Sequence, residues 1–265
     1  MTLLIGKAVV SVAVVLALAW LAEHVNARVA GIVSGMPLGG VLVLAFVGLE
    51  QGPAFAAQSA HFAVPSIIAT LAFAFGYYFG SHWGGRLSPL TATLLGLIGY
   101  FAIAGPLSLF DLGLLAGVGL ALTTLVVVAR LSHSREANRI ENRVPMTAPR
   151  LLFRAGTAAA IVVAITTFAE LLGPRWSGLL IGFPMTFLPF LLVIHITYSA
   201  EHVRTIIRNF PLGLVGLVIF LAISTLTIPA LGVALAIPAS LGGSLLYLSV
   251  LAIVLSRQRP ARAAA

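Results

Sequence analysis

Long apolar runs separated by short polar segments make up almost the whole chain. A helix that crosses a membrane needs about 20 consecutive apolar residues. The pattern predicts nine such spans, near residues 4–22, 30–49, 62–80, 90–107, 110–130, 151–172, 178–198, 211–228 and 229–256. The last span contains Pro238, which would kink or split it, so ten spans is the alternative. The sequence therefore predicts an all-α polytopic membrane protein.

The composition agrees with this prediction. Hydrophobic residues fill 60% of the positions and charged residues only 8%, with a mean hydropathy of +1.10, whereas soluble domains carry roughly 25% charged residues. The net charge of +8 would suit a nucleic-acid partner, but six of the fifteen basic residues lie in or beside segment 131–150 and three lie in the tail. That distribution is typical of cytoplasmic segments of membrane proteins. We therefore expect membrane lipids, and no nucleic acid, as partners.

Two apolar segments contain the same interruption, a glycine followed two positions later by a proline. "SGMPLGG" covers residues 34–40 and "IGFPMTF" covers residues 181–187. At an offset of 147, six of the sixteen positions between 22 and 37 are identical, and three of the matches are Glu, Arg and Pro, which are scarce in this chain. Composition alone would give about one or two matches, so the sequence predicts an internal duplication.

The charges of the loops predict how the two copies are oriented. Segment 131–150 and the C-terminal tail are both expected in the cytoplasm. An even number of spans must separate them, so the second copy has four spans and its segment 200–209, with Arg204 and Arg208, is cytoplasmic. The corresponding segment 50–61 has no Lys or Arg and is expected outside. The copies are thus predicted to be inverted, in a bacterial or archaeal inner membrane with the N-terminus outside and the C-terminus in the cytoplasm.

The predicted organisation has five parts. They are a first four-helix repeat (1–108), a linker transmembrane helix (109–131), a cytoplasmic Arg-rich loop (132–150), a second, inverted four-helix repeat (151–257) and a cytoplasmic tail (258–265). Inverted repeats are a common build of secondary transporters, in which the substrate site lies at the repeat interface near the membrane midplane.

Several stretches resemble the GlpM-like membrane proteins, which are small four-span proteins. In the first half they are "LLIGKA", "RVAGIVSGMPLGGVLVLAFVGLEQG" and "HFAVPSIIATLAFAFGYYF", and in the second half "LLFRA" and "SGLLIGFPMTFLPFLLVIHITYSAE". Each half has a basic residue, a glycine and two prolines in the same order: Lys7, Gly31, Pro37 and Pro65, then Arg154, Gly178, Pro184 and Pro211. The resemblance implies a tandem of two four-span units but no particular substrate. The architecture is more remotely similar to that of drug/metabolite transporters.

The matched interruptions are the first candidates for a transport pathway. A proline inside a membrane helix frees a carbonyl one turn earlier, and that group must find another partner. The expected pathway residues are Gly35, Pro37, Gly182, Pro184, Thr186 and His195. His195 is included because an ionisable residue within a span is a functional candidate. The alternative interpretations are close helix packing at the glycines and a buried, hydrogen-bonded histidine.

Four charged residues bracket corresponding spans and are candidates for gates. Inversion would bring Glu23 near Arg154 at the cytoplasmic face and Lys7 near Glu170 at the outer face. We expect two ion pairs, each of which closes one side in turn. The alternative is that all four side chains anchor the spans at the lipid headgroups.

Other chemistry has less support in the sequence. Arg28 and Arg175 open corresponding spans and are candidates to attract an anionic substrate, or else they mark headgroup depth. No metalloprotease, hydrolase or paired-carboxylate motif occurs within a span, and cysteine is absent. We therefore expect no enzymatic activity, catalytic residue, cofactor or metal site.

The function that best fits these features is a secondary transporter or exporter of a small metabolite or ion, working alone or as a homo-oligomer. One alternative is a lipid flippase or lipid-active accessory protein. The other is a membrane scaffold that transports nothing.

The gate pairs predict a specific rescue. Glu23→Arg or Arg154→Glu alone should reduce the flux of the transported substrate in vesicles, because two like charges then face each other. Exchanging both residues should restore the flux, because the ion pair forms again. A double exchange that stays as inactive as the single variants would contradict the pairing.

Overall fold

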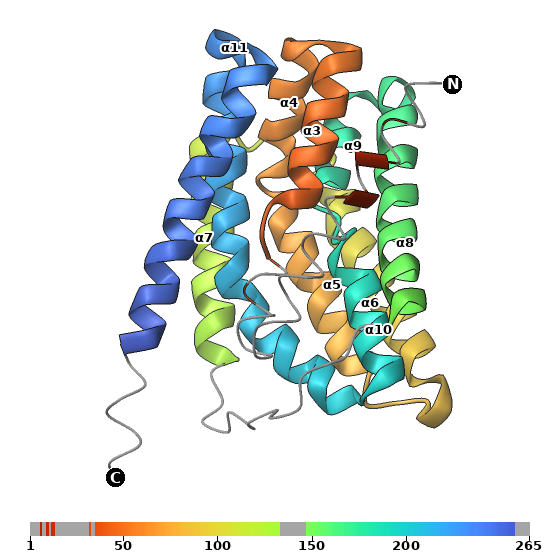
Figure 1. Cartoon of the computed structure of the whole chain (residues 1–265). Coiled ribbons are helices and arrows are strands. Elements are labelled where there is room, and N and C mark those ends of the chain that lie inside the picture. The colour runs from red at the N-terminus through yellow and green to blue at the C-terminus, as the bar shows by residue number, and fades with distance from the viewer. Residues whose placement is uncertain are drawn as a thin grey trace.

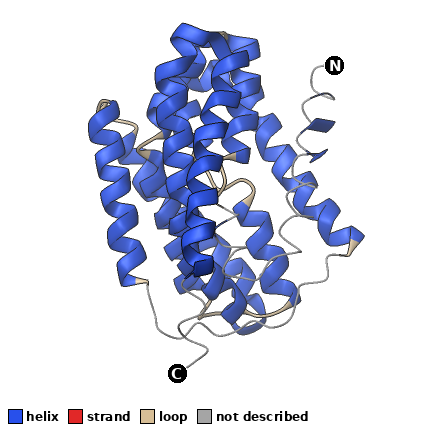
Figure 2. Cartoon of the chain, turned by 60° about the vertical axis from the view of Figure 1, so that its left-hand side comes forward, coloured by secondary structure: helices blue, strands red, loops and turns tan. Residues whose placement is uncertain are grey.

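The computed structural model describes residues 35–132 and 147–257, together with residues 6, 9–10, 12–13 and 32. The regular elements in this part of the chain are all helices, without a strand (Figure 2). In chain order they are α3 (Leu38–Gln51), α4 (Pro53–Ala63), α5 (Ser66–Gly80), η1 (Gly85–Leu87), α6 (Ser88–Leu107), α7 (Leu114–Leu131), α8 (Ala148–Thr167), α9 (Ala169–Ile181), α10 (Phe187–Thr197) and α11 (Ala200–Arg257).

Several of these helices are suited to a membrane. Within the described residues, four helices are long and apolar enough to cross one: Gly85–Leu107, Leu114–Leu131, Ala148–Thr167 and Ala200–Val254. The pair α4 and α5, bent by 50°, adds a fifth if it is a single broken span. The all-helical class predicted from the sequence is therefore confirmed, and the described helices include four or five candidate membrane spans. The count of nine spans stays a prediction.

The helices run between two ends of the molecule, which we name the upper and lower ends as drawn in Figure 1. The turn between α3 and α4 and the bend within α11 lie at the upper end. The turns between α5 and α6 and between α10 and α11 lie at the lower end. Segments far apart in the sequence therefore meet at each end.

Helix α11 folds back on itself at Gly232. This residue has φ 69° and ψ 171°, a conformation that glycine adopts readily and residues with a Cβ do not. The two arms of α11 pack against each other, and the Tyr247 hydroxyl of the second arm donates a 3.0 Å hydrogen bond to the Leu212 carbonyl of the first. Helix α11 is therefore a helical hairpin with its turn at Gly232, although its residues are assigned as one continuous helix.

Two segments that the sequence predicts as loops are helical. The predicted outer loop, 50–61, forms most of α4, and the predicted loop 200–209 forms the first turns of α11. Helix α4 begins with a proline, which suits a first turn because its missing N–H would have no partner there. It then buries small side chains, including Ala56 and Ala60. The polar residues of these segments lead to the prediction of loops. The packing of small side chains instead stabilises a helix in α4.

The two Gly-x-Pro segments, which precede α3 and α10, have the same pattern of backbone hydrogen bonds, and we call both of them interruptions. In both, the glycine N–H donates to the carbonyl three residues earlier, and the N–H just after the proline donates to the carbonyl just before it. These bonds are Gly35 to Ile32 (3.1 Å) and Leu38 to Met36 (2.9 Å) in the first segment, and Gly182 to Leu179 (3.2 Å) and Met185 to Phe183 (2.7 Å) in the second. Each backbone hydrogen bond of the first segment therefore has a counterpart 147 residues later in the second segment, which is the offset found in the sequence.

Each interruption packs against a helix of the other half of the chain. Gly182 lies against Ser66 at the start of α5, and Gly35 lies against Gly213 in α11. A side chain at either glycine would collide with its partner. The two contacts are also related by 147, because Gly182 follows Gly35 and Gly213 follows Ser66 by that number of residues.

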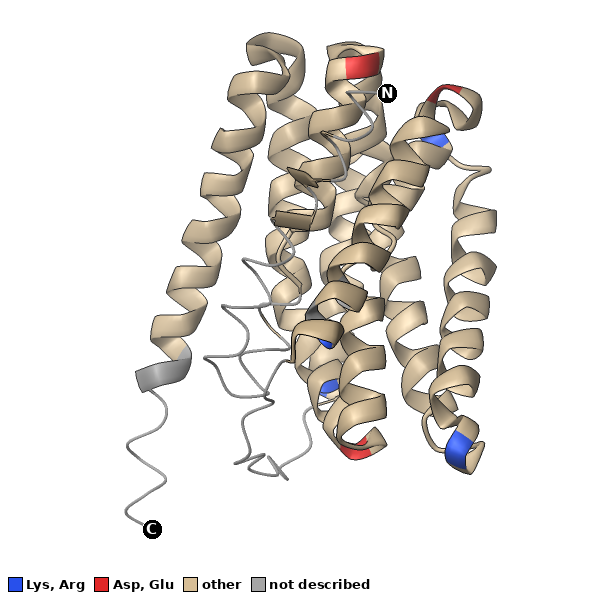
Figure 3. Ribbon diagram, turned by 45° about the vertical axis from the view of Figure 1, so that its right-hand side comes forward, with Lys and Arg blue, Asp and Glu red and all other residues tan. Residues whose placement is uncertain are grey.

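The outer surface is apolar between the two ends. Leu115 on α7 is 88% exposed, and large exposed apolar side chains also occur along α6, α8 and α11. Charged residues lie toward the two ends of the molecule (Figure 3). This distribution suits helices that face lipid tails in the middle and water or headgroups at the ends.

The close helix contacts predict a strong effect of one glycine. A Cβ at Gly178 would lie against the Ser59 carbonyl oxygen and 2.8 Å from the Phe62 Cβ of α4, so Gly178→Val must push α4 and α9 apart. We expect this variant to lose about 1–3 kcal/mol of stability, as overpacked cores do, and to melt at a lower temperature in detergent. Gly119→Val is the matched control, because nothing lies within 4 Å of a Cβ there. Equal melting temperatures for the two variants would contradict the packing.

Candidate functional site

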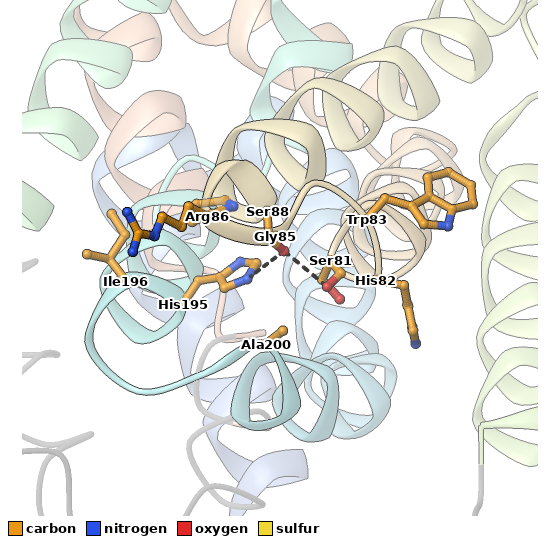
Figure 4. Close-up of a pocket in the computed structure, with 10 residues that line it drawn as sticks. Ser81, His82, Trp83, Gly85, Arg86, Ser88, His195, Ile196 and Ala200 are labelled. Atoms are coloured by element: carbon orange, nitrogen blue, oxygen red, sulfur yellow. Dashed lines mark hydrogen bonds between the residues drawn. The ribbon is translucent and has the colours of Figure 1, made fainter.

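A cavity of about 430 Å³ lies at the lower end, between the turn from α5 to α6 and the junction of α10 and α11 (Figure 4). Residues that line it include Ser81, His82, Arg86, Ser88, His195 and Ile196. Its volume falls in the range of roughly 300–1,000 Å³ that is usual for small-molecule sites. It is therefore a candidate site, and its lining contains ionisable and hydroxyl side chains.

Hydrogen bonds at the floor of the cavity hold His195 in place. The Tyr77 hydroxyl lies 3.1 Å from His195 Nδ1, and Ser88 Oγ lies 3.1 Å from His195 Nε2. The Ser88 hydroxyl donates to the Ser81 carbonyl at 3.0 Å. Its proton is thus in use, so Ser88 Oγ accepts from Nε2–H and Nδ1 accepts from the Tyr77 hydroxyl. This network assigns a neutral imidazole with its proton on Nε2.

The network connects the two halves of the chain. Tyr77 lies in the last turn of α5 and Ser88 is the first residue of α6, both in the first half. His195 lies near the end of α10 in the second half, and its side chain is only 7% exposed. We call Tyr77, Ser88 and His195 the lower latch, because they join the halves at the floor of the cavity.

Hydroxyl groups cover the carbonyls at the second interruption. Tyr100 of α6 donates to the Leu179 carbonyl and Thr70 of α5 donates to the Gly182 carbonyl, both at 2.5 Å. A broken helix in a membrane needs such partners, which neighbouring helices commonly supply. The interruption at Pro184 is therefore satisfied by protein groups rather than open to a ligand.

Of the six predicted pathway residues, His195 alone lines the cavity. Four of them are buried in the interior: Gly35, Pro37, Gly182 and Pro184. Thr186 is half-buried at the N-cap of α10 and makes no capping hydrogen bond. The cavity and the two interruptions are thus separate features, and His195 is the predicted residue that the structure brings to the cavity.

Arg175, a candidate for anion attraction, is engaged near the loop that follows α6. Its guanidinium donates a 2.9 Å hydrogen bond to the Ser108 carbonyl and lies 4.8 Å above the ring of Phe62. Nearby, His61 Nε2 lies 2.9 Å from the Asp111 carboxylate. The hydrogen bond from His61 and one from a backbone N–H lower the pKa of Asp111 below its ordinary value. These contacts tie α4 and α9 to the start of the linker helix α7.

The remaining candidates lie mostly outside the described residues. Lys7, Glu23, Arg28 and the side chain of Arg154 are not among them, so both gate ion pairs stay predictions. Glu170 is exposed in the first turn of α9. In the described ranges, no group of three or more His, Cys, Asp and Glu side chains could hold a metal ion.

Sequence reasoning did not find three residues of the lower end, Tyr77, Ser88 and Arg86, as site residues. A tyrosine within an apolar span is a usable signal, because a buried hydroxyl normally needs a hydrogen-bond partner. That signal would have identified Tyr77 and Tyr100. Ser88 and Arg86 give no comparable signal, since hydrophilic residues in a short loop are ordinary.

Removing single hydroxyl groups tests which of them stabilise the folded protein through a hydrogen bond. Tyr100→Phe removes one of the two donors to the buried Leu179 carbonyl, which keeps the 3.2 Å bond from the Gly182 N–H. The loss should cost about 0.5–1.5 kcal/mol, seen as a lower melting temperature in detergent. Tyr198→Phe removes a buried hydroxyl that has no hydrogen-bond partner among the described groups, so its melting temperature should stay or rise. Equal losses in both variants would mean that the bond to Leu179 contributes nothing.

Comparisons with known proteins identify no relative. No family model, no curated protein and no solved structure matches the chain. The resemblance to the GlpM-like membrane proteins therefore stays a prediction.

Proposed function

We propose that the chain is a secondary transporter that moves a small metabolite or ion across a membrane by alternating access between two inverted repeats. Transporters of this build bind their substrate where the repeats meet, often beside interrupted helices. Two sets of contacts support the proposal, one in the middle of the molecule and one at its two ends.

In the middle, the halves meet through matched interruptions. The backbone bonds around Gly35 and Gly182 have the same pattern at an offset of 147. Gly35 packs on Gly213 and Gly182 packs on Ser66, so each half inserts its interruption against the other half. Reciprocal contacts of this kind are expected of two copies that face each other, and they support an inverted repeat.

At the ends, corresponding positions carry different chemistry, and this observation carries the proposal. At the upper end Gly48 of α3 packs directly on Val233 in the second arm of α11. The residue 147 positions after Gly48 is His195, and the residue 147 positions before Val233 is Arg86. Both of these line the lower cavity. Corresponding positions thus form a tight apolar contact at the upper end (Gly48 and Val233) and line a polar cavity at the lower end (His195 and Arg86).

A transporter held in one state would have such a difference between its ends. Alternating access requires one side to be closed while the other is accessible. The contact of Gly48 with Val233 would close the upper side. The lower latch would close the passage from the cavity to the interior until the two halves move apart.

We also infer nine passes with the lower end in the cytoplasm. The bent pair α4 and α5, and the pair α9 and α10 interrupted at Pro184, each count as one pass, whereas α11 counts as two. With α3, α6, α7 and α8 these make eight passes, and the predicted span 4–22, most of which lies outside the described residues, is the ninth. Arg86, Arg130 and Arg204 belong to segments at the lower end, and Asp111 belongs to a loop at the upper end. An excess of arginine on one side is the usual mark of the cytoplasmic face.

Locking the upper contact should open the lower side. The chain has no cysteine, so new ones can be placed freely. In Gly48→Cys with Val233→Cys, the new Cβ would lie 3.2 Å from the Val233 Cβ, near the usual disulfide separation of about 3.5–4.5 Å. We expect oxidation to raise the rate at which a water-soluble maleimide labels a third cysteine, Ser81→Cys. Ser81 is buried at the cavity, and after the lock the lower side is the side that can still open.

A second crosslink within one half is the control for this experiment. Gly216→Cys with Ser244→Cys joins the two arms of α11, and a Cβ at 216 would lie 3.0 Å from the Ser244 Oγ. This disulfide should leave the labelling of Ser81→Cys unchanged, because it does not connect the halves. Equal labelling after either crosslink would contradict alternating access and favour a rigid scaffold.

A further inference from the structure

The ionisable side chains that line the lower cavity are all bases. They are His82, Arg86 and His195, and the lining contains neither Asp nor Glu. In the nearest stretch of α11, the cavity residue Ala200 is followed directly by Glu201, which does not line the cavity, and one turn later by Arg204. Arg86 carries the permanent positive charge of this lining, because the latch holds His195 neutral, and a charge of one sign at a concave site raises the local concentration of ligands with the opposite sign. The cavity is therefore suited to an anion.

Arg86 is the group in the cavity whose donors are free to bind. It is exposed on the short helix η1, and it makes no hydrogen bond or ion pair with any described residue. Other arginines are engaged, since Arg208 donates to the Tyr78 hydroxyl and Arg175 donates to the Ser108 carbonyl. The guanidinium offers five donors in a planar fork that matches a carboxylate or a phosphate.

The polar groups beside Arg86 at the latch are already in use. Both ring nitrogens of His195 and the Ser88 hydroxyl belong to the lower latch. Figure 4 shows Arg86 on the same side of the cavity as His195 and Ile196, with the Ser88 hydroxyl between His195 and Ser81. An occupant bound by Arg86 would therefore rest on the latch and touch the apolar side chain of Ile196.

The fold does not require an arginine at this place. Val233 occupies the position that corresponds to Arg86 at the other end, where it makes a tight apolar contact with Gly48. An arginine at 86 thus adds a charge that packing does not need. A charged group without a partner at a concave surface is a functional candidate.

From these observations we infer that the lower cavity binds a small organic anion whose carboxylate or phosphate pairs with Arg86 and whose apolar part contacts Ile196. The inference names the substrate class of the transporter and in that respect rests on the proposed function. Binding itself is measurable without transport.

The test uses labelled benzoate and the full-length protein in nanodiscs of phosphatidylcholine. Unlabelled benzoate and phenyl phosphate should displace the label, whereas neutral benzamide should not. Arg86→Gln should weaken binding by about tenfold or more, the usual effect of losing a charge-assisted hydrogen bond, and Arg86→Lys should restore part of it. Arg130→Gln, which removes an arginine at the end of α7 outside the cavity, should bind within about twofold of the parent protein.

Nanodiscs of phosphatidylglycerol distinguish the two sources of the anion. Benzoate binding that persists there identifies a free anion as the occupant. Loss of benzoate binding to the parent protein there, with binding kept in phosphatidylcholine, identifies an anionic headgroup that competes for Arg86, and both results support the anion site. The inference is overturned if benzamide competes as well as benzoate, or if Arg86→Gln and Arg130→Gln bind alike.

The failure of this inference can be distinguished from the failure of the transporter proposal. If benzoate binds through Arg86 but the Gly48–Val233 crosslink leaves Ser81→Cys labelling unchanged, the anion site stands and the transporter does not. If the crosslink changes the labelling but no anion binds, the transporter stands and this anion site does not.

Discussion

The close approach of backbones at a few glycines is the constraint on which the rest of the structure depends. Helices in a membrane gain little from the hydrophobic effect when they associate, so they rely on tight packing of small residues. Gly182 against Ser66 and Gly35 against Gly213 bring the two halves into direct contact at the centre. The positions of the interruptions, of the hydroxyl groups that cover them and of the two ends all follow from this contact.

Buried polar groups have different surroundings at the centre and at the lower end of the molecule. At the centre, Tyr100 and Thr70 bond the carbonyls that the interruption at Pro184 exposes, so polarity there stabilises the fold. At the lower end, the latch around His195 is also satisfied, but Arg86 beside it is not engaged by any described residue. Polar groups with partners and a charged group without one therefore lie at different heights along the molecule.

The sequence predicts this structure well where the information is local. Long apolar runs predict the helices, and the repeated Gly-x-Pro pattern predicts where two of them are interrupted. The prediction of a loop at 50–61 is wrong. The helix there is stabilised by the packing of alanines such as Ala56, and this packing depends on neighbours that are distant in the sequence. The bond between Tyr77 and His195 joins residues 118 positions apart. Such contacts depend on tertiary packing, so the sequence could identify His195 as a candidate but not its partners.

In the proposed inverted repeat, Gly48 corresponds to His195 and Val233 to Arg86, and this correspondence has a consequence for how a transporter of that build can evolve. Two separate copies of one short chain would carry the same residue at both ends, so a histidine added for one side would also appear on the other. A single chain that contains both copies escapes this restriction, since a substitution in one copy leaves the other as it was. Each membrane face can then acquire its own chemistry independently. A rectifying carrier, with unequal affinities inside and outside, becomes accessible by single mutations.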